Sequence, residues 1–138
     1  MIIVVDVSIV VKWFVNEILT QNAEKLLDGS YVLYAPELIL PEFGSVIWKK
    51  VRRGEIDSKE GSVIIDAFGK QKIKIMPQHG LLKASYVGAQ MSGQSVYDWT
   101  YLALAISLSC KFVTADAKFF SALETTPVRK HLLWAGDL

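Results

Sequence analysis

The sequence predicts an α/β protein with a three-layer α/β/α fold around a central, mainly parallel sheet of about four to five strands. Short β-branched runs alternate with longer segments in which apolar residues recur at helical spacing. The first run, residues 2–5, is apolar throughout, as expected for a strand covered on both faces. A chain of 138 residues suits one domain with one core. We therefore expect residues 1–138 to form a single domain.

The first half of the chain alternates strands with helices. The expected elements are a strand at 2–6, helices at 8–14 and 20–30, a strand at 31–36, and helices at 37–55 and 58–71. Ser8 is the expected cap of the first helix, and Thr20 that of the second. Gly29 is placed to end the second helix.

The second half continues the alternation. The expected elements are a strand at 72–77, helices at 80–91 and 95–109, a strand at 111–116, a short helix at 117–123, and an edge strand at 131–134. Pro77 closes the third strand. The helix at 95–109 carries the strongest apolar pattern.

Composition excludes several classes of protein. The chain is 51% hydrophobic and 21% charged, which excludes a disordered chain. Its net charge of +1 argues against a strongly basic protein that coats nucleic acid. The one cysteine, Cys110, excludes an internal disulfide and a cysteine-based zinc site, and its apolar helical setting predicts a buried thiol. His79 and His131 lie far apart in the sequence, so histidine acid–base catalysis is poorly supported.

The apolar N-terminal run resembles a targeting segment only superficially. It has no basic start and no cleavage site of small residues, and Asp6 and Lys12 interrupt it. It is also too short and too charged to span a bilayer. We therefore expect a soluble protein of the cytoplasm.

Four acidic residues fall where ligands bind in such a fold, beyond the carboxyl ends of the strands. Asp6 ends the first strand and Asp116 follows the fourth, whereas Glu42 and Asp98 lie near helix starts. Two carboxylates about 4 Å apart repel by roughly 4 kcal/mol at an effective dielectric constant near 20. A divalent cation removes that repulsion, and oxygen ligands without histidine or cysteine favour Mg²⁺ or Mn²⁺. This predicts a metal site.

Each acid also has a purely local explanation. Asp6 and Asp116 can cap the helices that follow them. Ser95 and Asp98 have the spacing of a capping box, and Glu42 can favour the positive end of its helix. Taken together, four acids at one edge of a sheet are less easily explained by capping.

Four motifs span nearly the whole chain in order: "VVDVSIVVKWF", "PELILPEFGSVIWKKVRRGEI", "SVYDWTYLALA" and "FVTADAKF". With these motifs the chain resembles the PIN domain, and more narrowly the VapC toxins of toxin–antitoxin pairs. This resemblance implies a metal-dependent ribonuclease that an antitoxin of the VapB type inhibits. Matched by position, the acidic residues of the family are Asp6, Glu42, Asp98 and Asp116. Ser8 and Thr114 match supporting polar positions, and family members often form dimers.

Two positions depart from the family pattern. Trp99 follows Asp98, where a small residue is common; it either narrows the site or stacks on a base, or lies in the core or an interface. Pro41 precedes Glu42, and it either kinks the helix or starts it. That choice decides where Glu42 points.

The predicted function is hydrolysis of RNA phosphodiesters. One or two Mg²⁺ or Mn²⁺ ions would lie between Asp6, Asp98 and Asp116, with Glu42 adding a ligand directly or through water. The densest basic run either binds RNA phosphates or is a solvated helix end, and it comprises Lys49, Lys50, Arg52 and Arg53.

Surface aromatic residues suggest partners. We expect a homodimer and a hydrophobic groove for an antitoxin helix. The interface candidates, for which the core is the default place, are Trp13, Phe14, Trp48 and Trp134.

Two other functions remain open at this point. A Mg²⁺-dependent phosphatase of the haloacid dehalogenase type would use a strand-end aspartate, but "DVS" lacks the second aspartate of such enzymes. A binding module with an inactive site is the third possibility.

Overall fold

Five parallel strands form the single sheet of the computed structural model, which describes residues 1–138. The strands are β1 (Ile2–Val5), β2 (Val32–Pro36), β3 (Ile73–Met76), β4 (Lys111–Thr114) and β5 (Leu132–Trp134). Their order across the sheet is β3-β2-β1-β4-β5, and every neighbouring pair is parallel. The expected three-layer α/β fold is confirmed, and the edge strand at the C-terminal end is present.

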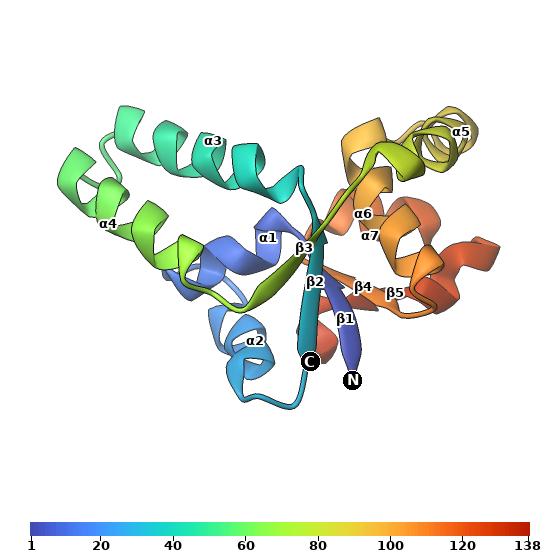
Figure 1. Ribbon diagram of the computed structural model, residues 1–138, viewed down its shortest axis with the longest axis horizontal. Coiled ribbons are helices and arrows are strands. Elements are labelled where there is room, and N and C mark those ends of the chain that lie inside the picture. Colours follow the sequence, from blue (N-terminus) through green and yellow to red (C-terminus); the bar gives the residue numbers. More distant parts are fainter.

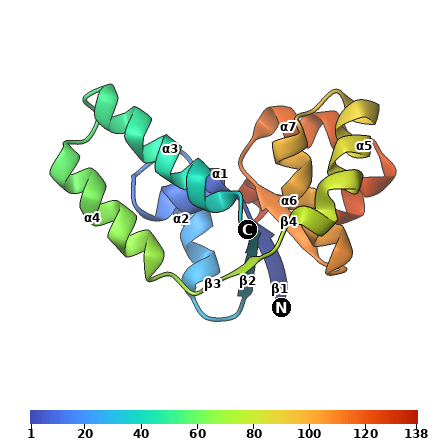
Figure 2. The same cartoon turned by 45° about the horizontal axis from the view of Figure 1, so that its top comes forward.

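Seven α-helices cover the two faces of this sheet. They are α1 (Val7–Val10), α2 (Thr20–Glu24), α3 (Ile39–Arg52), α4 (Ser58–Gly69), α5 (Leu82–Ser92), α6 (Val96–Ser107) and α7 (Ala117–Leu123). Short 3₁₀ turns follow at Val11–Trp13, Lys25–Leu27, His79–Leu81, Pro127–His131 and Ala135–Asp137. Helices α1 to α4 lie on one side of the sheet and α5 to α7 on the other (Figures 1 and 2).

The core is densest where α6 packs on the sheet. β1 is buried from Ile3 to Val5, and α6 buries Tyr101, Leu102 and Leu104 against it and its neighbours. A helix that is apolar on most of its surface belongs in such a central position. The same helix carries Asp98 in its first turn, so the core sets the position of that carboxylate.

Two predicted helix starts are wrong in detail. Asp6, and not Ser8, is the N-cap of α1, because its carboxylate accepts the Ile9 amide. Thr20 is the first residue of α2 and does not cap it; Leu19 precedes it with a left-handed φ of 69°. The Thr20 hydroxyl instead accepts the Glu17 amide. The Asp6 side chain therefore satisfies the start of α1, whereas the start of α2 has no side-chain cap.

Pro41 does not kink α3. It is the third residue of the helix, within the first turn, where backbone N–H groups have no partner inside the helix. Glu42 therefore stands in the first turn of a regular helix.

Most candidate interface aromatics are partly buried. Trp13 and Phe14 pack against the core, and Trp134 meets the Phe120 ring at 5.6 Å. Trp48 is 56% exposed, with the Arg52 guanidinium 5.1 Å from its ring centre.

Two further expectations concern Cys110 and membranes. The Cys110 thiol is half-buried rather than buried, and burial raises its pKa, which disfavours the reactive thiolate. None of the helices combines the length and the apolar character needed to cross a bilayer.

Candidate active site

The site lies where the order of the strands reverses. The chain runs from β1 outward through β2 and β3, and then returns to place β4 on the other side of β1. Ligands of open parallel sheets bind at such a switch point, beyond the carboxyl ends of the strands. Asp6 follows β1 directly, and Asp116 lies two residues beyond the end of β4.

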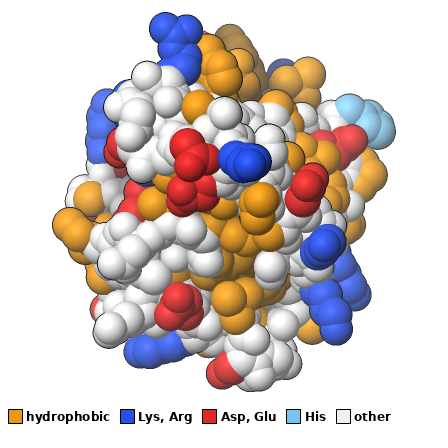
Figure 3. Space-filling model, turned by 90° about the vertical axis from the view of Figure 1, so that its left-hand side faces the viewer, with side chains coloured by type: hydrophobic (Ala, Val, Ile, Leu, Met, Phe, Trp, Pro, Cys, Tyr) orange, Lys and Arg blue, Asp and Glu red, His pale blue; other side chains and the backbone are white.

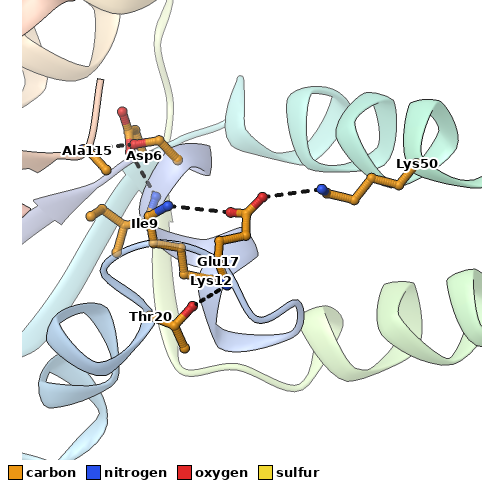
Figure 4. A network of polar contacts seen from close by, with 8 residues as sticks. Asp6, Ile9, Lys12, Glu17, Thr20, Lys50 and Ala115 are labelled. Carbon is orange, nitrogen blue, oxygen red and sulfur yellow. Dashed lines mark hydrogen bonds and ion pairs between the residues drawn. The ribbon is translucent and has the colours of Figure 1, made fainter. Parts of the chain in front are cut away.

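Asp6 is buried and fully engaged in hydrogen bonds. Its Oδ1 accepts the Ser8 hydroxyl at 2.5 Å and the Ile9 amide at 3.2 Å, and its Oδ2 accepts the Thr114 hydroxyl at 3.0 Å. Only 6% of the residue is exposed. The carboxylate is thus held in one orientation, in the position shown with Ile9 and Ala115 in Figure 4.

Ser8 and Thr114 connect Asp6 to the segment after β4. The Ser8 hydroxyl accepts the Ala115 amide, and the Thr114 hydroxyl accepts the Asp116 amide, each at 3.0 Å. Both hydroxyls donate to Asp6, so each joins the ends of β1 and β4. This is the supporting position expected for both residues.

Asp116 and Asp98 each use one carboxylate oxygen at the start of a helix. Asp116 Oδ1 accepts the Phe119 amide at the start of α7, at 3.1 Å. Asp98 Oδ2 accepts the hydroxyl of Ser95, which caps α6 and itself accepts the Asp98 amide. Asp6 and Asp116 are therefore helix caps, whereas Asp98 contacts the capping residue Ser95, and in each case these bonds use only one carboxylate oxygen.

Glu42 is held from across the molecule. Its Oε1 accepts the hydroxyl of Tyr101 at 2.5 Å, which joins the first turn of α3 to the second turn of α6. Tyr101 was not among the predicted site residues. Its place one turn after Asp98 on the same face of a helix was the available signal.

The free oxygens of this cluster meet solvent. Asp98 Oδ1, Asp116 Oδ2 and Glu42 Oε2 have no hydrogen-bond partner in the protein. No buried side-chain oxygen or nitrogen lacks a partner, so these three atoms are accessible. The cluster therefore combines one buried carboxylate with three that each present an open oxygen.

The carboxylates disfavour one another's charge. Burial, strengthened by the charge of Asp98, raises the pKa of Asp6 from 3.8 to about 7, although three hydrogen bonds oppose this. Burial and then the Asp98 charge raise the pKa of Glu42. Burial and then Asp116 raise the pKa of Asp98, against the effects of Ser95 and Lys118. Such a set of perturbed acids at one edge of a sheet is typical of a functional site.

The donor set fits a hard divalent cation in its chemistry. It contains only oxygen atoms, and a positive ion would relieve the repulsion that raises these pKa values. No three acidic, histidine or cysteine side chains are arranged to hold one ion together in this structure. The carboxylates are instead oriented by hydrogen bonds at the helix starts and by the Tyr101 hydroxyl. Separate orientations are expected for groups that repel one another.

Only part of the basic run at the end of α3 is free. Lys50 binds Glu17 at 3.2 Å, and Lys12 binds the other oxygen of Glu17 at 3.4 Å (Figure 4). These pairs tie α3 to the segment after α1. Lys49 and Arg53 are exposed, and Lys49 lies about 10 Å along the helix from Glu42.

Trp99 is a core residue and not part of the site surface. It is 8% exposed, and its Nε1 donates to the Ser92 hydroxyl at 2.7 Å. Its ring lies directly against Gly88, so it fills the contact between α5 and α6. This confirms the core interpretation of Trp99.

Comparison with known proteins decides the family. The sequence model of the PIN domain matches residues 3–124. The chain belongs to the PIN domain family. A relative of this PIN domain is Ribonuclease VapC3 of Pyrobaculum aerophilum, 30% identical over 128 residues that cover 89% of the chain and 98% of the relative. PIN-domain ribonucleases of the VapC type generally depend on a divalent metal.

Two solved structures share the fold of this PIN domain. VapBC2 from Rickettsia felis, bound to a DNA fragment from its promoter, matches with a TM-score of 0.66 and 17% identity, over 97% of this chain and 98% of that one. VapC20 of Mycobacterium tuberculosis, a toxin that cleaves the sarcin–ricin loop, matches with a TM-score of 0.67 and 15% identity, over 88% and 95%.

Proposed function

We propose that this PIN domain is an endoribonuclease of the VapC type, the toxin of a toxin–antitoxin pair. The observation that carries the proposal is the group of four carboxylates at the switch point between β1 and β4, where the Thr114 hydroxyl links the Asp6 carboxylate to the backbone amide of Asp116. The relationship to Ribonuclease VapC3 supports RNA as the substrate. With RNA as substrate, the protein would act in the cytoplasm. Residues 1–138 would form one domain, since they are built around one sheet.

Asp6, Asp98 and Asp116 are the proposed metal ligands, and Glu42 contributes directly or through water. The proposed ion is Mg²⁺ or Mn²⁺, since all the donors are oxygen atoms. When bound, such an ion supplies an activated water and positive charge at the phosphate. Ser8 and Thr114 keep the Asp6 carboxylate in place, so that its two oxygens are already oriented before substrate binds.

The one cysteine is not arranged as an activated nucleophile. Cys110 is half-buried with a raised pKa, and the His131 Nδ1 lies 2.9 Å from the Cys110 carbonyl oxygen.

Lys49 and Arg53 are the proposed phosphate contacts of the RNA, because Lys50 is engaged by Glu17 and Arg52 lies over Trp48.

An antitoxin of the VapB type is the proposed partner. Hydrophobic side chains gather between charged ones on the end of the molecule formed by α3 and α4 (Figure 3). A groove there is lined by Ile47, Trp48, Val51 and Ile65, among others. An apolar helix face suits such a groove. A homodimer is proposed in addition, on the resemblance to VapC proteins.

Asp98→Asn tests the activity. In a cleavage assay with single-stranded RNA and Mg²⁺ or Mn²⁺, we expect a loss on the order of 100-fold or more. Asp66→Asn, an exposed change on α4, is the matched control and should cleave like the wild type. RNA cleavage that persists unchanged in Asp98→Asn, or in EDTA, would contradict the proposal.

Two further substrates separate the alternatives. Hydrolysis of p-nitrophenyl phosphate without cleavage of RNA would favour a phosphatase. Metal-independent RNA binding with no cleavage at all would favour an inactive binding module.

A further inference from the structure

The tyrosine that contacts Glu42 connects two elements that are otherwise separate at the site. Tyr101 lies in α6 and Glu42 in α3, 59 residues apart in the sequence. The distance of 2.5 Å between Tyr101 Oη and Glu42 Oε1 is that of a hydroxyl donating to a charged carboxylate, which is among the stronger hydrogen bonds in proteins.

The Tyr101 ring is held firmly by other aromatic rings. It is 1% exposed and stacks on Phe112 of β4, with ring centres 5.6 Å apart and planes 11° apart. Phe112 in turn meets the edge of Phe119 in α7 at 6.0 Å. The Phe119 amide donates to Asp116 Oδ1. The hydroxyl of Tyr101 therefore occupies a position that the core determines.

Glu42, in contrast, has no other support. It is half-buried, and the bond from Tyr101 is its only side-chain hydrogen bond. A glutamate side chain has several rotatable bonds, so without a hydrogen-bond partner it would populate many conformations. One oxygen is bound, and the other, Oε2, stays accessible.

We propose that Tyr101 is a positioning residue of this site: its hydroxyl anchors one oxygen of Glu42 and leaves the other free to serve the metal ion. The proposal rests on the proposed metal-dependent function. Tyr101 touches neither RNA nor metal and acts only through Glu42. Its hydroxyl is thus part of the site, whereas its ring is part of the core.

Tyr101→Phe removes the hydroxyl and keeps the ring that stacks on Phe112. We expect an unchanged circular dichroism spectrum, an unchanged KM for RNA, and a kcat about 10-fold to 100-fold lower. The Mn²⁺ dissociation constant, measured by calorimetry without RNA, should rise by about the same factor. Tyr86→Phe, an exposed change on α5, is the matched control and should alter none of these values.

A double-mutant cycle with Glu42→Ala separates positioning from a general effect on folding. If Tyr101 acts through Glu42, Tyr101→Phe should have no further effect on kcat or on Mn²⁺ affinity in the Glu42→Ala background. An effect on folding would appear equally in both backgrounds, and would overturn the proposal. So would a Tyr101→Phe protein that equals the wild type in kcat and in Mn²⁺ affinity.

Failure of the proposed function has a different signature. A wild-type protein that neither cleaves RNA nor binds Mn²⁺ refutes the metal-dependent nuclease, and the role of Tyr101 with it. A wild-type protein that binds Mn²⁺ but cleaves no RNA refutes the nuclease alone, and the Mn²⁺ titrations still decide the role of Tyr101.

Discussion

Replacing Asp6 with asparagine should stabilise the metal-free protein at alkaline pH while removing its response to metal. Burial raises the pKa of Asp6 to about 7, from an ordinary value of 3.8. Between these two values the folded protein keeps a proton that the unfolded chain releases. The contribution of Asp6 to stability is therefore most favourable below about pH 4, declines as the pH rises, and reaches its full penalty above about pH 7.

The size of this penalty follows from the shift. A pKa of about 7 in place of 3.8 corresponds to roughly 4 kcal/mol of unfolding free energy, which is an upper value for the gain on neutralising the group. Asparagine keeps the size of the side chain, but it loses the charge-assisted part of the bonds from Ser8 and Thr114. We therefore expect a net gain of about 1–3 kcal/mol at pH 8 and close to none at pH 4.

Urea denaturation in EDTA at both pH values measures this gain, with Asp66→Asn as the exposed control. Adding Mn²⁺ should then stabilise the wild type by mass action but leave Asp6→Asn unchanged. An Asp6→Asn protein that is no more stable than the wild type at pH 8, or that gains equally at pH 4, would refute the reasoning. A full Mn²⁺ response in the variant would remove Asp6 from the metal site.

Three other changes have defined outcomes. Gly88→Ala places a methyl group against the Trp99 ring and should cost roughly 1–3 kcal/mol in urea denaturation, whereas a neutral result would mean that α5 and α6 separate easily. Glu17→Gln leaves its two lysine partners without an anion and should cost about 1 kcal/mol, with a smaller loss at high salt; equal losses at low and high salt would exclude an electrostatic cause. Reversing the charges of Lys49 and Arg53 should weaken RNA binding and lower the slope of log affinity against log salt by about 1 for each residue, and an unchanged slope would exclude both from the RNA surface.

The elements of the fold could be predicted because their signals are local. The apolar run at residues 2–5 and the helical pattern around Leu102 and Leu104 each depend on neighbours a few positions away. The caps at Ser95 and Asp116 rest on contacts three residues apart and could also be predicted. The cap of α1 was misassigned because Asp6 and Ser8 compete for the same helix end, and only the folded geometry decides between them.

The convergence of the acids followed from one general rule about parallel sheets. Once strands at 2–6 and 111–116 are parallel neighbours, Asp6 and Asp116 must emerge at the same edge. The sequence contained no information that these two strands, and not two others, are adjacent.

Local sequence patterns specify the class of fold, the strands and helices, and the chemical kind of site, because hydrophobic period and residue type act over short distances. Which groups meet depends on how the folded elements pack. Tyr101 reaches Glu42 across 59 residues, and Thr114 reaches Asp6 across 108. The tertiary structure also decided that Lys50 is bound by Glu17 and that Trp99 lies in the core. Such contacts depend on how complete elements pack around one core, and no local pattern specifies them.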